Sequence, residues 1–261
     1  MTGNQKTWGD LVALYASLGA TPTVERKLKE FRQLRWKELK ALTFDQTQPL
    51  HFLELLKSGG TYTQECLKAI QNYALDNHDI PRPILATKWW PKRLKRTPRA
   101  ITLEEHTVLV SNIVARHWKY YLELLWETGA SQSDAASFRL EFIQKGVLEY
   151  QRKKTGTRAA FQLSEKASMI VVAATRGRDK GFILPQIERL SSNNRAHIFR
   201  TQCMRLDVRG VTLHSYRYAW AQRAFEQGVP ERLAKIGLGH NSSAIHHYYA
   251  KGASVVAPAL S

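Results

Sequence analysis

A run of basic residues interrupted by prolines divides the chain after its first third. Residues 88–99 read KWWPKRLKRTPR, with six basic side chains, no acidic one, and prolines at positions 91 and 98. Proline fixes φ and lacks an amide hydrogen, so regular structure is disfavoured through such a segment. The sequence therefore predicts two domains, residues 1–87 and 102–261, joined by a basic linker at residues 88–101.

The residues before this linker show the apolar spacing of short helices. A first helix is expected around residues 8–15, and a second is expected to begin at Thr23 as its N-cap. A third is predicted over residues 49–57, and a fourth is predicted to begin with Thr61 or Thr63 as its cap. Together these helices predict a small bundle.

The part after the linker combines helices with one β element. Thr102 and Glu105 form a capping box that opens a helix. Residues 147–163 change to two strand-like runs around a Lys-Thr-Gly-Thr turn, and helical periodicity dominates residues 193–228 and 231–236. The predicted fold class is mainly α with a small β-sheet, in which a helical N-terminal bundle precedes an α+β domain.

The balance of charge indicates a polyanionic partner. Lysine and arginine total 39 against 22 acidic residues, a formal net charge of +17 spread along the chain. This favours nucleic acid over a solvated basic surface, but charge alone does not separate DNA from RNA or acidic lipid. No apolar run is long enough to cross a bilayer, and the N-terminus is polar, so an intracellular protein is expected.

Cysteine usage adds no covalent or metal framework. Cys66 and Cys203 are the two cysteines, and they lie far apart in no paired spacing. We therefore expect neither a disulfide nor a cysteine-based zinc site, and we interpret both as small buried hydrophobes.

The strongest motif lies near the C-terminus. The sequence LHSYR at residues 213–217 is followed by Leu-Gly-His ending at His240, and Tyr249 comes nine residues later. Residues three apart share a helix face, so His214 and Arg217 are expected to point at one target. The polar segment from His240 to Tyr249 suits a mobile connection that carries a nucleophile.

These three elements, in this order and at these separations, resemble the tyrosine recombinase or phage integrase family. GGTYTQECLKAIQNYALDN is similar to the last helix of the family's DNA-clamping bundle, and PRAITLEEH is similar to the entry of its catalytic domain. The resemblance covers nearly the whole chain. It implies a core-DNA-binding domain at residues 1–87 and a catalytic domain at residues 102–261.

The resemblance also implies the active-site residues and the reaction. The tyrosine attacks a DNA phosphate to form a 3′-phosphotyrosyl link, arginine and histidine stabilise the transition state, and lysine protonates the leaving 5′-oxygen. No metal and no nucleotide cofactor are implied. The catalytic positions carried over are Tyr249, Arg217, His214, His240, Lys154 and the position of Ser131, with Lys153 as the second candidate for the lysine.

One position departs from the family pattern. The segment TGASQSDAASFR places Ser131 where the family has its first catalytic arginine, while Asp134 keeps the acidic position and Arg139 falls where a structural arginine is common. Loss of one preorganised cationic donor typically costs on the order of 3 kcal/mol of transition-state stabilisation. The expectation is a slow enzyme, a cation drawn from a neighbouring residue or protomer, or lost cleavage.

Partners follow from the same resemblance. It implies double-stranded DNA held in a clamp, a homo-oligomer of four protomers on DNA, and a cytoplasmic, nucleoid-associated protein of bacteria, phages or mobile elements. The apolar residues 255–260 are either a segment that docks on a neighbouring protomer or a frayed end. The predicted DNA contacts are Lys88, Lys92, Arg93, Lys95, Arg96, Arg99 and Lys153.

Alternatives to this interpretation remain open. Tyr248 is a rival nucleophile, although the spacing from His240 favours Tyr249. His246 and His247 are adjacent, which is poor geometry for joint metal ligation. The chain could be a recombinase-fold DNA-binding protein without catalysis, or a type IB topoisomerase.

Overall fold

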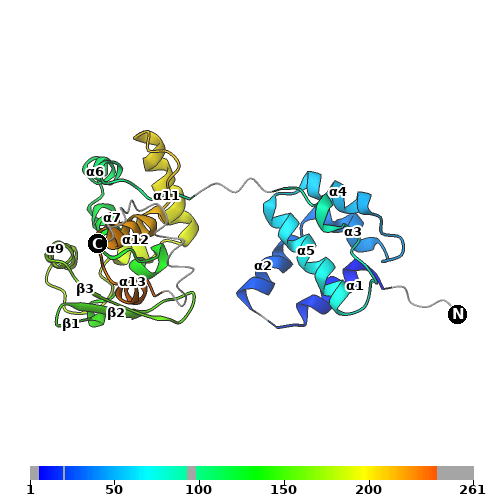
Figure 1. Cartoon of the computed structure of the whole chain (residues 1–261), viewed down its shortest axis with the longest axis horizontal. Coiled ribbons are helices and arrows are strands. Elements are labelled where there is room, and N and C mark those ends of the chain that lie inside the picture. Colours follow the sequence, from blue (N-terminus) through cyan, green and yellow to red (C-terminus); the bar gives the residue numbers. More distant parts are fainter. Residues whose placement is uncertain (1–5, 20, 93–97, 240–261) are drawn as a thin grey trace, which may run out of the picture. The chain divides into compact units, whose positions relative to one another are not determined.

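The computed structural model describes residues 6–19, 21–92 and 98–239, and its described part is mainly helical with one small sheet (Figure 1). Contacts divide the chain into two compact units, Met1–Lys95 and Arg96–Ser261. The predicted fold class is confirmed, since helices make up the first unit and the second combines helices with an antiparallel sheet.

The first unit is a bundle of short helices around an aromatic core. Phe31 and Trp36 meet edge to face with ring centroids 4.7 Å apart, and Trp8 meets Phe52 at 5.4 Å. These four side chains are almost completely buried, which makes them the main apolar contribution to this core. The described elements are α1 (Trp8–Ala16), α2 (Pro22–Phe31), η1 (Leu34–Trp36), α3 (Lys37–Ala41), α4 (Pro49–Ser58), α5 (Thr61–Asp76) and η2 (Thr87–Trp89).

Two helix caps in this unit differ from the prediction. Helix α2 begins at Pro22 with Thr21 as its N-cap, whose hydroxyl accepts from the amide of Val24, because proline suits the first helical position. Helix α5 is preceded by Gly60, and the Thr63 hydroxyl instead donates to Glu30 across the bundle at 2.7 Å. The predicted caps Thr23, Thr61 and Thr63 are therefore wrong.

The beginning of the basic segment belongs to the core of the first unit. Trp90 is 8% exposed, and its indole N–H donates to the carbonyl of Leu85 at 3.0 Å. Lys68 places its ammonium 4.9 Å from the centre of the Trp90 ring, a cation–π contact. The buried side chain of Trp90 thus holds the start of residues 88–101 against the first unit, although the prolines predict a linker there.

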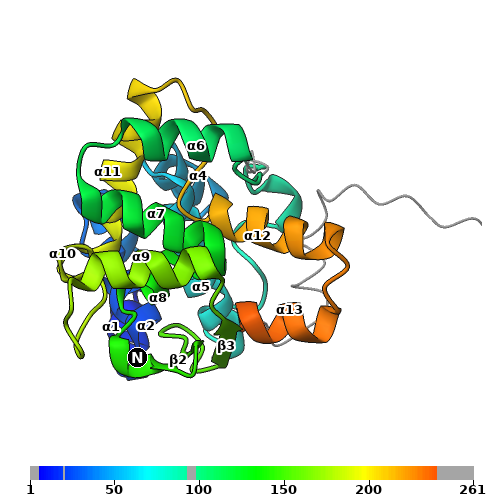
Figure 2. The ribbon, with the colours of Figure 1, turned by 90° about the vertical axis from the view of Figure 1, so that its left-hand side faces the viewer.

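The second unit is organised around helix α7. This helix contacts α6, α9 and α12, and α13 lies against strand β3 (Figures 1 and 2). Thr102 forms the predicted capping box with Glu105 at the start of α6. The described elements are α6 (Leu103–Asn112), α7 (Arg116–Thr128), α8 (Gln132–Ala136), η3 (Leu140–Phe142), β1 (Ile143–Gln144), β2 (Val147–Gln151), β3 (Arg158–Gln162), α9 (Glu165–Thr175), α10 (Pro185–Glu188), α11 (Ser192–Arg205), α12 (Ser215–Glu226) and α13 (Glu231–Leu238).

The sheet contains the predicted hairpin and one additional short strand. Strands β2 and β3 pair antiparallel, with Leu148 opposite Phe161 and Tyr150 opposite Ala159, and these alternate residues face the core. The two-residue strand β1, which the sequence pattern does not predict, pairs with β2 through a tight turn at Lys145 and Gly146, both with positive φ.

The helical stretch predicted for residues 193–228 is interrupted. Helix α11 ends at Arg205 and α12 begins at Ser215. Between them Asp207 and Gly210 have positive φ, a conformation that a helix cannot continue through. The break places His214 at the N-cap of a new helix instead of inside a long one.

Two further expectations concern the membrane and the cysteines. Among the described residues, no helix combines the length and apolar character needed to span a bilayer. Cys66 and Cys203 are both buried free thiols, as predicted.

Gly129 is a position where the fold requires glycine. It ends α7 with φ +60°, and a Cβ there would lie 2.7 Å from the Cβ of Trp220. We predict that Gly129→Ala lowers the free energy of unfolding by about 1–2 kcal/mol for the left-handed backbone and by about a further 1–3 kcal/mol for the forced contact. Urea unfolding measures this loss.

Gly156 provides the matched control. Its φ is +66°, but nothing lies within 4 Å of a Cβ built there. Gly156→Ala should therefore show the backbone penalty alone. Equal losses in the two variants would contradict the steric role of Trp220.

Candidate active site

Arg217 lies buried in the first turn of α12 with 1% of its surface exposed. Its Nη1 donates to the carbonyl of Gly129 at 3.1 Å, and its Nη2 donates to the carbonyl of Leu238. These carbonyls stand at the C-terminal ends of α7 and α13, where backbone oxygens lack helical partners and carry partial negative charge. The arginine therefore joins the ends of two helices to the start of a third.

His214 directly precedes α12, and its carbonyl accepts from the Arg217 amide at 3.0 Å. Its ring meets Tyr218 edge to face at 5.4 Å, and the residue keeps solvent-exposed surface although protein atoms surround most of the imidazole. Protein atoms packed around it lower its pKa to about 4, and the charges of Arg217, Arg152 and Lys154 act in the same direction. The structure thus brings these three cations close to His214.

Ser131 is the N-cap of α8. Its hydroxyl accepts from the Asp134 amide and donates to Asp134 Oδ2 at 2.7 Å. Asp134 is 2% exposed, so this carboxylate is held inside the unit. The hydroxyl at position 131, where the family has its first catalytic arginine, is therefore bonded to Asp134 and supplies no positive charge.

Asp134 also connects α8 to the β2–β3 hairpin. Its Oδ1 accepts from the backbone N–H of Lys153 at 3.0 Å, and its Oδ2 lies 3.5 Å from Arg152 Nε. The side chains of Lys153 and Lys154 are exposed in the turn that follows β2. The charge of Lys154 contributes to the lowered pKa of His214.

Arg152 is a site residue that the sequence pattern does not predict. Its side chain is 13% exposed, and its Nη1 donates to the carbonyl of Gly239 at 2.8 Å. Gly239 has φ +58°, and a Cβ there would lie 2.5 Å from Arg152 Cδ. The available signal was a third cation directly before the Lys-Lys pair, in a chain that lacks an arginine at position 131.

Several predicted site residues lie outside the described residues. They are His240, Tyr249, the rival Tyr248, the neighbouring His246 and His247, the apolar residues 255–260, and the linker residues Arg93, Lys95 and Arg96. The structure therefore brings together Arg217, His214 and Lys154 of the predicted set, with Ser131 beside them through Asp134.

The described linker cations differ in their contacts. Lys88 and Lys92 are exposed, and Lys88 lies 5.4 Å from the Trp89 ring centre. Arg99 instead donates to Glu105 at 2.8 Å and to the carbonyl of Arg209. We therefore assign Arg99 to packing within the second unit.

Arg139 does not join the site. Its guanidinium pairs with Glu141 at 2.9 Å and lies 4.8 Å from the Phe182 ring centre. This arginine is a surface contact between η3 and the segment before α10, in keeping with a structural part.

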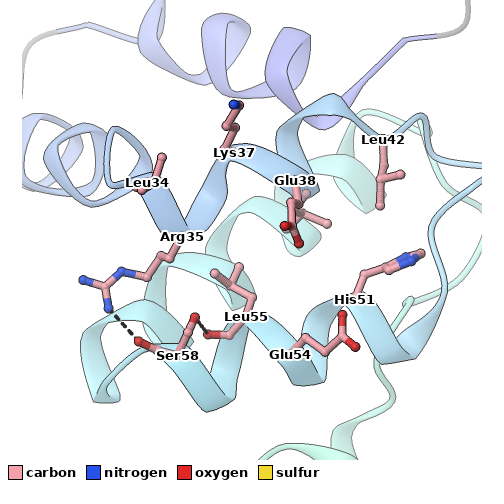
Figure 3. A pocket seen from close by; sticks show the side chains of 10 residues that line it. Leu34, Arg35, Lys37, Glu38, Leu42, His51, Glu54, Leu55 and Ser58 are labelled. Carbon is pink, nitrogen blue, oxygen red and sulfur yellow. Dashed lines mark hydrogen bonds between the residues drawn. The ribbon is translucent and has the colours of Figure 1, made fainter.

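A hollow of about 530 Å³ lies in the first unit between α3 and α4 (Figure 3). Its wall mixes apolar side chains with both signs of charge. Arg35 donates to the carbonyl of Ser58 at 2.9 Å, and the Ser58 hydroxyl donates to Leu55 at 3.0 Å. Because these polar groups bond to their neighbours, we assign no chemistry to this hollow.

The described residues include no group of three or more histidine, cysteine or acidic side chains that could hold a metal ion. The charges near His214 are instead mainly cationic, with Asp134 as the nearby acid. Such an arrangement suits an anion, and guanidinium groups suit phosphate oxygens in particular.

Comparison with known proteins gives the family. The model of the phage integrase family matches residues 102–254, which is more than half of the chain. The chain belongs to the phage integrase family. No curated protein is similar enough in sequence to count as a match.

Solved integrase structures share its fold. A lambda integrase dimer bound to a COC′ core site matches with TM-score 0.76 and 18% identity, over 97% of this chain and 79% of that one. A lambda integrase tetramer bound to a Holliday junction gives 0.75 and 17%, over 98% and 81%. The Tn1549 transposon integrase with circular intermediate DNA gives 0.73 and 11%, over 96% of each chain. At these identities the likeness shows the tyrosine recombinase fold.

We predict that His214 stays neutral at pH values well below the range in which histidine usually titrates. Its pKa of about 4 means that protonation is disfavoured in the folded state relative to the unfolded chain, where the value is 6.5. Stability is therefore unaffected above about pH 6.5 and falls as pH drops from there towards 4. NMR titration of the ring, assigned with His214→Gln, measures the midpoint; a midpoint near 6.5 would contradict both the desolvation of the ring and its cationic surroundings.

Proposed function

We propose that this phage integrase family member is a site-specific tyrosine recombinase that cleaves and rejoins duplex DNA through a 3′-phosphotyrosyl intermediate at Tyr249. The observation that carries the proposal is Arg217, fixed to Gly129 and Leu238 beside His214 and Lys154. A cationic group held rigidly before the substrate arrives stabilises the charge that develops in a transition state.

The chemistry balances without a metal or a nucleotide. The Tyr249 hydroxyl attacks phosphorus, its P–O bond forms, and the bond from phosphorus to the 5′-oxygen breaks. Lys154 gives a proton to that leaving oxygen, and His214, being neutral, takes the tyrosine proton. An anionic phosphate nearby raises the pKa of His214 from its low value, which improves it as a base.

The remaining groups act on the same phosphate. Arg217 neutralises charge on the oxygens of this phosphate, and His240, the residue that follows Gly239 in sequence, donates a hydrogen bond to it. The 5′-hydroxyl set free by cleavage later attacks a phosphotyrosyl link and restores the DNA strand. No cofactor enters this scheme.

Double-stranded DNA is the proposed partner. The chain carries a formal charge of +17, and its structural relatives are integrases in complexes with a core site, a Holliday junction and circular intermediate DNA. We assign residues 1–87 to core-DNA binding, residues 102–261 to catalysis, and the basic segment, Lys88, Lys92, Arg93, Lys95 and Arg96, with Lys153, to phosphate contacts. A homotetramer on DNA, acting in the cytoplasm at the nucleoid, completes the proposal.

A second function is a recombinase-fold DNA-binding protein without cleavage. Ser131 favours it, because the hydroxyl at the first-arginine position is bonded to Asp134 and carries no charge. The presence of Arg217, His214 and Lys154 in one place favours catalysis, since DNA binding alone has no need of this arrangement. Cleavage assays separate the two functions.

We expect a denaturant-resistant protein–DNA adduct when the protein meets nicked duplexes drawn from a sequence library. The nick lets the cleaved fragment diffuse away, so the covalent intermediate accumulates. Tyr249→Phe should abolish the adduct because it removes the attacking oxygen, and electrophoresis under denaturing conditions measures this.

Tyr248→Phe is the matched control and should leave the adduct in place. An adduct that survives Tyr249→Phe but is lost in Tyr248→Phe would move the nucleophile by one residue. The absence of an adduct from the wild type and from Ser131→Arg, despite tight DNA binding, would favour the non-catalytic function.

The apolar residues 255–260 are proposed to dock on a neighbouring protomer. Deletion of residues 253–261 should then weaken assembly of several protomers on DNA more than binding of one protomer. Gel-shift titration resolves the two kinds of complex. Equal weakening of both would refute docking.

A further inference from the structure

We propose that Arg152 supplies the guanidinium that the family takes from its first catalytic arginine and binds a non-bridging oxygen of the scissile phosphate. The inference rests on the proposed recombinase function and names a catalytic residue for it. In this chain the cation would come from the β2–β3 hairpin, because the loop before α8 carries Ser131 instead.

Arg152 and Ser131 both contact the carboxylate of Asp134. Asp134 Oδ2 accepts the Ser131 hydroxyl at 2.7 Å and lies 3.5 Å from Arg152 Nε. The same carboxylate oxygen of Asp134 therefore contacts both Ser131 and the guanidinium of Arg152. The side chain of an arginine at position 131 would also begin beside the carboxylate of Asp134.

Arg152 and Arg217 are anchored on consecutive carbonyls. Arg217 donates to Leu238, and Arg152 donates to Gly239 at 2.8 Å. Two guanidinium groups from separate elements thus meet at the C-terminal turn of α13, directly before His240 in sequence. Two guanidinium groups that bind one phosphate stabilise the double negative charge of its pentacoordinate transition state.

Arg152 also keeps hydrogen-bonding capacity for a ligand. Its described contacts use Nε and Nη1, and within the described residues its Nη2 has no hydrogen-bond partner. The side chain is 13% exposed, so little water competes for it. Asp134 fixes the plane of the guanidinium, as a preorganised donor requires.

A purely structural interpretation is the rival. Arg152 could serve to tie the hairpin to the end of α13, with Gly239 kept small to admit its side chain. A tie acts through the position of the hairpin, whereas a phosphate ligand acts through its charge near the phosphate. In a variant that lacks Arg152, an arginine placed at position 131 restores the positive charge but not the contact between the hairpin and Gly239.

The test uses a nicked duplex that yields an adduct with the wild type. Arg152→Gln should lower the rate of adduct formation by about 10²–10³-fold, and adding Ser131→Arg should restore most of that rate. The control, Arg158→Gln, removes an exposed cation from the same hairpin and should change the rate little. Arg152→Lys keeps the positive charge but lacks the two-pronged guanidinium, so its rate of adduct formation should lie between those of the wild type and Arg152→Gln.

The outcomes separate this inference from the proposed function. An undiminished rate in Arg152→Gln, or a loss that Ser131→Arg does not restore, overturns the role of Arg152 while recombination stands. If no duplex gives an adduct with the wild type, the proposed function fails, and the His214 titration then decides whether the Arg152 charge faces the site. Burial and Arg217 lower the pKa of His214 more than Arg152 does, so Arg152→Gln should raise this pKa only in part, and an unchanged value in this variant overturns the inference.

Discussion

The contact on which the second unit depends is that of the Arg217 guanidinium with the carbonyls of Gly129 and Leu238. A charged group this deeply buried is tolerated because partially negative helix ends surround it. The glycine at position 129 is required by the left-handed end of α7 and by the close approach of Trp220. Backbone conformation, packing and the proposed phosphate site therefore meet at one residue.

Asp134 organises the other side of the site. It caps no helix itself, yet it accepts from the Ser131 hydroxyl and from the Lys153 amide while it pairs with Arg152. A buried carboxylate is stable only with such partners. The same contacts hold the turn that carries Lys154, so the placement of this proposed general acid depends on Asp134, a carboxylate on another element.

Sequence patterns predicted the elements whose signals are local. The capping box at Thr102, the β2–β3 hairpin and the helix at residues 49–57 follow from short-range spacing and appear in the fold. The break between α11 and α12 was missed, because Asp207 adopts a positive φ that residue type rarely reveals. Arg152 was missed because its importance arises from Asp134 and Gly239, which are 18 and 87 positions away in the chain.

The β2–β3 hairpin carries both Arg152 and Lys154, with an exposed turn between Arg152 and Thr157. If Arg152 stabilises the charge of the transition state and Lys154 protonates the leaving oxygen, both contributions to catalysis depend on the position of one hairpin. Any substitution that displaces this hairpin from Asp134 or Gly239 would then move both groups at once.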